Sequence, residues 1–202
     1  DLAVVFYCLV ENEQMGCGMI TIYNDHIQMW NTTVEVLLEH AKKNSLGFKI
    51  QDLEEVMREM LIENIQREFG DKISDQNADT FSGDAKHEEE ELEYLIDQML
   101  LDMKDDSRTK MYILTNEPKV NGAVCMMNYE LLQRFAEQMN SDFYIIPSSI
   151  HEVILVPTIG ETDSKRLSNM VREVNETQVE EQEVLSDHVY FYSRKQNEIV
   201  YA

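Results

Sequence analysis

Segments with the composition of β-strands occur in this chain as neighbouring pairs, and this pairing restricts the fold more than any other feature of the sequence. Residues rich in Val, Ile, Phe and Tyr flank turn residues in each pair, which predicts hairpins. The expected pairs are 2–11 with 18–23, 111–115 with 122–127, 143–146 with 152–156, and 188–193 with 198–201. Glu117-Pro118 and Asn121-Gly122 supply the turn chemistry of the second pair.

Amphipathic helices are predicted between these pairs, because apolar residues recur there at helical spacing. The expected start signals are Asn24 for a short helix to Trp30, Thr32 with Glu35 as a capping box, Asp52 with Glu55, Asn128, and Thr162 or Asp163. Strands and helices do not alternate strictly. We therefore expect an α+β fold with an antiparallel or mixed sheet built from hairpins, with the helices packed on it, in a single domain over residues 1–202.

The charge balance excludes one large class of function. The chain carries 39 acidic and 17 basic residues, a formal net charge of −22. Ordinary nucleic-acid binding is excluded, because that affinity comes from Lys and Arg side chains that neutralise phosphates. A hydrophobic content of 43% nevertheless predicts a folded protein.

Much of the acidity is concentrated in the middle of the chain. Residues 71–91 are rich in Asn, Asp, Ser and Gly, so we expect a flexible acidic insertion. From about Glu90 an acidic helix is predicted, since four apolar residues fall on one face: Leu92, Leu95, Ile96 and Met99. We expect this face to dock on its own domain or on a second copy, so self-association or a protein partner is the expected interaction.

The longest apolar run, from Leu2 to Val10, is far shorter than the roughly 20 residues of a membrane helix, and we expect neither a membrane anchor nor a signal peptide. Because the chain begins at Asp1 and not at Met, we expect further residues before it in the natural protein. The cysteines Cys8, Cys17 and Cys125 each lie in an apolar stretch, which favours buried free thiols in the cytoplasm. The alternative is a Cys8–Cys17 bridge across the hairpin, which would leave one thiol over.

Several longer segments resemble an uncharacterised bacterial family, a domain of unknown function. They are SDFYIIPSSIHEVILVP at 141–157, MVREVNET at 170–177 and LSDHVYFY at 185–192. The similarity begins at DLAVV, residues 1–5, and covers most of the chain. No activity, cofactor or partner is established for that family. The resemblance therefore implies a bacterial cytoplasmic setting and one continuous domain, and it assigns no catalytic residue.

The most suggestive catalytic cluster is Ser149, His151 and Glu152, where a hydroxyl, an imidazole and a carboxylate lie close in sequence. A nucleophile needs a base within hydrogen-bond reach, and the base needs an orienting group. Alternate residues of a strand share a face, so Ser149 and His151 are able to meet, with Glu152 on the opposite face. The simpler interpretation, which we favour, is a turn followed by an ordinary strand residue.

Metal and cofactor sites are not predicted. The histidines His26, His40, His87, His151 and His188 show no helical ligand pairing, and the acidic runs fit no Ca²⁺-loop template. Glycines are scattered singly, which disfavours a phosphate-binding loop. Trp30 and the helical methionines are interpreted as core residues; these methionines are Met57, Met60, Met99, Met103, Met139 and Met170.

Together these observations favour a non-enzymatic, cytoplasmic protein-interaction module. The alternative is a small hydrolase or another acid–base enzyme centred on Ser149, His151 and Glu152. Mimicry of nucleic acid toward a basic protein is a third hypothesis, which rests on charge alone.

Overall fold

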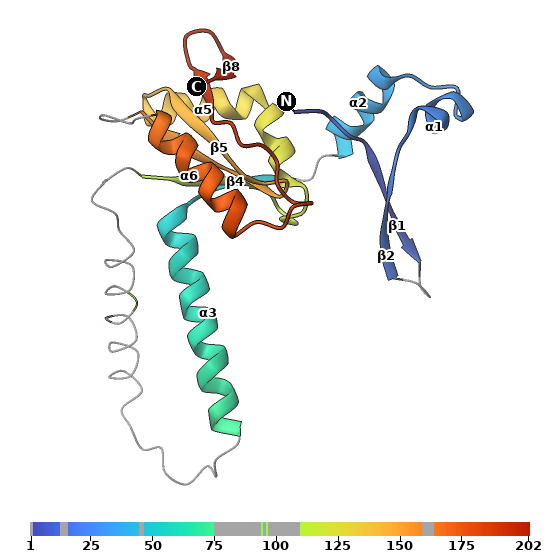
Figure 1. Ribbon diagram of the computed structural model, residues 1–202. Helices are drawn as coiled ribbons and strands as arrows, with labels where there is room; N and C mark the ends of the chain where they lie inside the picture. The colour runs from blue at the N-terminus through green and yellow to red at the C-terminus, as the bar shows by residue number, and fades with distance from the viewer. Residues whose placement is uncertain are drawn as a thin grey trace. The chain divides into compact units, whose positions relative to one another are not determined.

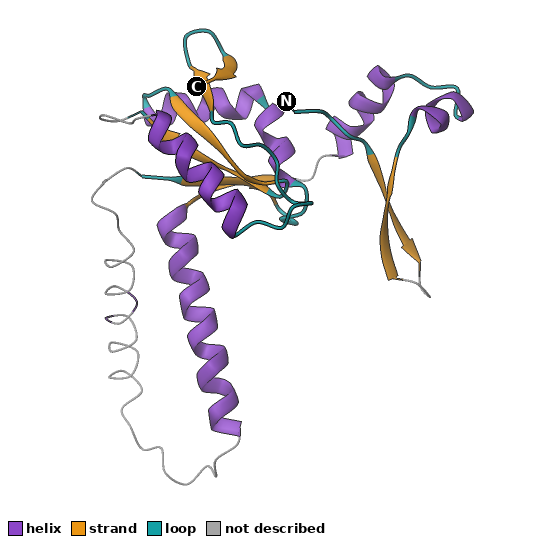
Figure 2. Ribbon diagram, in the orientation of Figure 1, coloured by secondary structure: helices purple, strands orange, loops and turns teal. Residues whose placement is uncertain are grey.

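The computed structural model describes residues 2–12, 16–44, 47–74, 94, 96, 110–158 and 164–202. The chain has an α+β fold with antiparallel sheets, as the paired strand segments predicted (Figures 1 and 2). It divides into two compact units, residues 1–47 and 48–202. No described helix is both long enough and apolar enough to span a bilayer.

The N-terminal unit consists of a hairpin and two helices. Strands β1 (Tyr7–Asn12) and β2 (Gly16–Thr21) pair antiparallel, and helices α1 (Asn24–Met29) and α2 (Val34–Asn44) follow. The hairpin and the short first helix confirm the sequence prediction. None of the described side chains in this unit is buried.

The predicted cap of α2 is displaced by one residue. Thr33, and not Thr32, precedes the helix, and its Oγ1 accepts a hydrogen bond of 3.4 Å from the backbone N–H of Val36. Hydrogen bonds from the Thr33 side chain and from its own backbone hold the pKa of the Glu35 carboxyl below its usual range. The predicted capping box of Thr32 with Glu35 is therefore wrong in its N-cap residue, and Glu35 instead accepts from the Thr33 side chain and from its own backbone N–H.

The second unit is built on a six-stranded antiparallel sheet with the order β3-β4-β6-β5-β7-β8. Its strands are β3 (Phe48–Asp52), β4 (Tyr112–Asn116), β5 (Phe143–Ser149), β6 (Glu152–Pro157), β7 (Tyr190–Ser193) and β8 (Glu198–Tyr201). Two predicted hairpins, β5–β6 and β7–β8, are confirmed. Strand β3, which pairs with β4, was not predicted.

Helices α3 (Leu53–Ser74), α5 (Tyr129–Met139) and α6 (Ser164–Thr177) and the 3-10 helix η1 (Gly122–Met127) complete this unit. The predicted caps of two helices are confirmed. Asp52 Oδ1 accepts from the N–H of Glu54 at 2.9 Å, and Asn128 Oδ1 accepts from the N–H of Leu131 at 3.1 Å.

The prediction of a strand over 122–127 is wrong, because these residues form η1. Asn121, in the left-handed conformation with φ of 51°, turns the chain away from β4. The neighbours of β4 are β3 and β6, so no edge is left for a strand from this segment. The N–H of Ala123 instead donates to the carbonyl of Ile150 at 3.2 Å.

Apolar side chains pack on both faces of the sheet, because successive residues of a strand point to opposite sides. One face carries α5 and η1, with Leu132, Phe135 and Ala136 against strand residues such as Ile145 and Leu155. The other face carries α6, whose buried Leu167 and Val171 pack with Ile146, Val156 and Val189. The result is three layers, with the sheet between helices (Figure 1).

The predicted acidic insertion and acidic helix lie mostly outside the described residues. Helix α3 continues through Ser74, so residues 71–74 are helical and do not belong to a loop. Of the predicted docking face, only Ile96 is described: it is helical and fully buried, while Tyr94 is 64% exposed. Leu92, Leu95 and Met99 lie outside the described residues.

Several residues interpreted as core are exposed. Trp30 is 48% exposed and Met60 57%, and Met170 and Cys8 are also on the surface. Trp30 stacks on the ring of His26, with 5.5 Å between the centroids, in a unit that has no buried side chain to pack against. Met57 and Met139 are partly buried, as predicted.

Candidate functional site

The predicted residues Ser149, His151 and Glu152 lie at the turn between β5 and β6. Ser149 ends β5 and pairs with Glu152, the first residue of β6, while Ile150 and His151 form the turn between them. The pairing register of β5 and β6 shifts between Pro147 and Ser149. Pro147 has no amide N–H to donate to a neighbouring strand, and it lies next to this shift. The turn thus brings the three residues to one end of the sheet.

Ser149 and His151 are connected through the backbone and not through the imidazole. Ser149 Oγ accepts a 3.0 Å hydrogen bond from the backbone N–H of His151. This is the local turn bond expected of a serine two residues before an amide. It orients the hydroxyl toward the peptide, whereas activation as a nucleophile requires contact with a basic nitrogen.

Both nitrogens of the His151 ring face other groups. Nδ1 accepts a hydrogen bond of 3.0 Å from the backbone N–H of Asn121, and Nε2 lies 3.5 Å from Oε1 of Glu183. A neutral imidazole has one donor and one acceptor nitrogen, so this arrangement places the proton on Nε2. The acceptor lone pair is already occupied, and a general base would need it free.

The backbone around His151 is fastened to three neighbouring segments. Thr115 Oγ1 donates to the carbonyl oxygen of His151 at 2.8 Å. The carbonyl of Ile150 accepts from Ala123, and the N–H of Ile150 donates to the carbonyl of Glu183 at 2.9 Å. We call the set His151, Asn121 and Glu183 the His151 latch, since these residues join the hairpin turn, the start of η1 and the turn at 181–183.

Gly122, which has no side chain, allows the start of η1 to lie close to Thr115 and to the backbone of His151. A Cβ at this position would lie 2.2 Å from Thr115 Oγ1 and 2.5 Å from the carbonyl oxygen of His151. Sequence reasoning identified Asn121-Gly122 as turn residues but missed their role in the latch, and it missed Glu183 entirely. Asn121 and Glu183 lie about 30 residues on either side of the hairpin turn, and no local pattern connects them to it.

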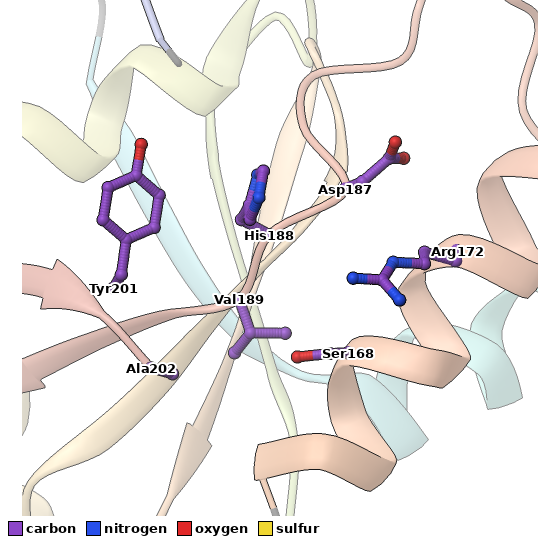
Figure 3. A pocket seen from close by; sticks show the side chains of 7 residues that line it. All are labelled: Ser168, Arg172, Asp187, His188, Val189, Tyr201 and Ala202. Atoms are coloured by element: carbon purple, nitrogen blue, oxygen red, sulfur yellow. The ribbon is translucent and has the colours of Figure 1, made fainter.

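A second candidate site is a pocket of about 300 Å³ between α6 and the ends of β7 and β8. It is lined by Ser168, Arg172, Asp187, His188, Val189, Tyr201 and Ala202 (Figure 3). No site was predicted here from the sequence, because the polar lining residues come from a helix, a loop and a terminal strand. A pattern that is local in sequence does not reveal such a grouping.

Neither site has the donor set of a metal centre. Within the part of the chain that the structure describes, no three His, Cys, Asp or Glu side chains lie close enough together to hold a metal ion. The latch contributes one imidazole and one carboxylate, and the pocket combines an imidazole and a carboxylate with a guanidinium. Arg is always protonated and cannot serve as a ligand.

Comparison with known proteins leaves the chemistry of both sites open. No solved structure and no curated protein sequence matches this chain. A family model does match, over residues 1–194, and so includes the first compact unit, most of the second, the latch and most of the pocket residues. The chain belongs to that family, which is described as a family of unknown function, DUF5688.

Proposed function

We propose that this protein is a non-enzymatic protein-interaction module and that the hairpin β1–β2 is its docking element. The observation that carries this proposal is the exposure of apolar side chains on both faces of the hairpin. Tyr7, Leu9 and Met19 share one face, and Cys8, Val10 and Ile20 share the other. Leu9 is 60% exposed and Ile20 53%.

Strands that are apolar on both faces normally lie inside a larger sheet with both faces covered. An isolated two-stranded hairpin is marginally stable in water, so this hairpin gains most by binding another surface. Its edges also carry few of the charges that usually prevent strand pairing: residues 2–10 and 16–23 contain no Asp, Glu, Lys or Arg, and Glu11 near the end of β1 is the one charged residue of the two strands. A partner strand is able to pair with residues 7–10 or with β2 without burying a charge.

The acidic helix is a less suitable docking element than the sequence indicated. Ile96, at the centre of its predicted apolar face, is already fully buried in a single chain. A partner that binds Ile96 would first have to displace what covers it. We therefore place the protein partner at the hairpin.

The proposed setting is the bacterial cytoplasm. Cys8 and Cys125 are free thiols, and Cys8 is exposed, which suits a reducing compartment. The alternative function, a small hydrolase at Ser149, His151 and Glu152, has less support, because Ser149 Oγ bonds a backbone amide and Nδ1 of His151 is occupied.

Site-specific photo-crosslinking in cells of the native host tests the proposal. A photoreactive amino acid replaces Leu9 or Ile20 in the hairpin, and Val200 in β8 serves as the control because it is 44% exposed and apolar. We expect a discrete crosslinked protein band from both hairpin positions and none from position 200. Absence of a hairpin-specific band would contradict the proposal. Mass spectrometry of the band distinguishes a second copy from another protein.

A further inference from the structure

We propose that the pocket between α6 and β7–β8 binds a small organic carboxylate, and that Arg172 is the residue that recognises it. The inference uses residues of the second unit only, so it stands independently of the proposed docking hairpin. Its evidence is the unpaired guanidinium, the apolar walls around it and the rigid frame that holds them.

Arg172 is the only lining residue that is always positively charged, and no acidic side chain in the described part of the chain pairs with it. In Figure 3 its guanidinium extends from α6 into the pocket, toward His188 and Ser168. No described residue forms an ion pair or a hydrogen bond with it, although acidic residues outnumber basic ones by 39 to 17. An unpaired guanidinium with five donors is a ready partner for an anion.

The nearby carboxylate of Asp187 is engaged elsewhere. Its Oδ1 accepts a hydrogen bond of 2.8 Å from Nδ2 of Asn175, and in Figure 3 the carboxylate points away from the centre of the pocket. Ser168 does not compete for an anion either, since its hydroxyl donates to the carbonyl of Ser164 at 2.9 Å. Arg172 is therefore the lining residue that offers a bound anion a permanent positive charge.

The remaining walls suit an apolar body attached to that anion. The rings of His188 and Tyr201 meet edge to face, with 5.4 Å between the centroids, and Val189 is buried against the apolar residues of α6. The N–H of Ala202 donates to the carbonyl of Val189 at 3.0 Å, which joins two of the lining residues beyond the paired ends of β7 and β8. A ligand that combines a carboxylate with an aromatic or aliphatic group fits this division into a charged and an apolar side.

The frame of the pocket is fixed before any ligand binds. Asn175, which is 9% exposed, donates from Nδ2 to the carbonyl of Ser186 at 3.0 Å as well as to Asp187. Ser186 Oγ in turn accepts from the N–H of His188 at 3.0 Å and lies 3.1 Å from the hydroxyl of Tyr190. These bonds tie the loop to α6, so little conformational entropy is lost when a ligand enters.

Size and geometry narrow the class of ligand. A volume of about 300 Å³ lies at the lower end of small-molecule pockets, which corresponds to a ligand of about the size of one amino acid. The planar guanidinium binds a carboxylate through two parallel hydrogen bonds. The net charge of −22 repels anions at long range, but this repulsion is screened beyond a Debye length of about 8 Å at physiological salt.

Titration followed by NMR tests the inference, with phenylacetate as the probe and phenylacetamide as its neutral analogue. We expect saturable shifts of the His188 and Val189 amides with phenylacetate and none with phenylacetamide. Arg172→Gln should weaken binding by about 10-fold or more, in keeping with about 1.5–3 kcal/mol for a charged hydrogen bond. Arg172→Lys should recover only part of the affinity, because it keeps the charge but not the planar donor pair.

Lys195→Gln is the matched control, since it removes the same charge from the exposed β7–β8 turn. Unchanged binding in this variant would assign the effect to Arg172 itself. The inference is wrong if phenylacetate causes no saturable shift, if Arg172→Gln binds it as the parent protein does, or if phenylacetamide binds equally well. Tighter binding of inorganic phosphate, or full recovery by Arg172→Lys, would also overturn the assignment to a carboxylate.

Discussion

The backbone N–H of Asn121 donates a hydrogen bond to Nδ1 of His151 across a separation of 30 residues, with 3.0 Å between the two nitrogens. The imidazole therefore has a structural role, because its Nδ1 accepts from a backbone N–H at the start of η1. It also occupies the lone pair that a general base at this position would use.

The first prediction is that Ser149 is not a catalytic nucleophile. A fluorophosphonate probe should fail to label the native protein, because no basic nitrogen contacts Ser149 Oγ in this arrangement. Ser149→Ala should change the free energy of unfolding by no more than about 1 kcal/mol, and His151→Ala by about 0.5–1.5 kcal/mol through the lost bond to Asn121. Labelling that disappears in Ser149→Ala would restore the hydrolase hypothesis.

The second prediction concerns the close approach at Gly122. Gly122→Ala should lower the free energy of unfolding by about 1–3 kcal/mol or more, because the new Cβ would meet Thr115 Oγ1 and the backbone at His151 and Asn116. Gly18→Ala is the control, since the nearest atom to its Cβ is the carbonyl oxygen of Val10 at 4.0 Å. Urea denaturation measures both. Equal stability of the two variants would mean that the latch does not pack as described.

Sequence patterns predicted correctly those elements that are stabilised by contacts between residues close together in the sequence. The cap at Asn128, the buried face of α5 with Leu132 and Phe135, and the β5–β6 hairpin depend on residues a few positions apart. Strand β3 was missed because Lys49, Gln51 and Asp52 interrupt its apolar residues, and the strand is fixed by pairing with β4 over 60 residues away.

The candidate sites were harder to predict from the sequence, because their residues are brought together by contacts between distant segments. The segment 122–127 reads as a strand by composition, but it forms a 3-10 helix whose first residue lies close to Thr115 and to the backbone of His151, 29 residues away in the sequence. Arg172, Asn175 and Asp187 lie close only because α6 packs against the segment before β7. Ser149, His151 and Glu152 do lie at the β5–β6 hairpin, but Ser149 ends a strand and His151 lies in the turn, where the sequence predicted a turn at Ser149 and a strand at His151. The partners that decide their chemistry were not predicted.

The third prediction tests the buried face of the acidic helix at the position that the structure describes. Ile96→Ala should lower the free energy of unfolding by about 2–5 kcal/mol, because it removes a fully buried side chain. Tyr94→Ala should change it by no more than about 0.5 kcal/mol, since Tyr94 is largely exposed. Thermal or urea unfolding measures both variants. If Ile96→Ala is as stable as Tyr94→Ala, the helix face is not packed in solution.

The fourth prediction separates two thiols by their reaction with iodoacetamide. Burial raises the pKa of the Cys125 thiol above its ordinary value, so at pH near 8 the reactive thiolate is scarce there. Cys8 is exposed on β1 and should be alkylated first. Timed quenching followed by peptide mass spectrometry gives both rates. Faster modification of Cys125 than of Cys8 in the native protein would show that the packing beneath η1 opens readily.

The last prediction is a loss of stability in alkali that depends on Tyr192. Burial, followed by the negative charges of Glu137 and Asp142 and the neighbouring Tyr129, raises the pKa of the Tyr192 hydroxyl in the folded state. The unfolded chain releases this proton near pH 10 while the folded chain retains it, so the folded state binds more protons above that pH. The stabilisation is therefore complete below about pH 10 and is lost as the pH rises through the folded value.

Tyr192→Phe removes this titration together with the 2.7 Å hydrogen bond to Oδ1 of Asn197. We expect the variant to be less stable than the parent at neutral pH. Above about pH 10 its free energy of unfolding should fall less steeply with pH, the two slopes differing by up to about 1.4 kcal/mol per pH unit. Tyr94→Phe is the control, because that side chain is 64% exposed and is not among the groups that raise the pKa of Tyr192. Urea midpoints measured at several alkaline pH values give the slopes, and identical slopes for the parent and Tyr192→Phe would show that another group governs unfolding in alkali.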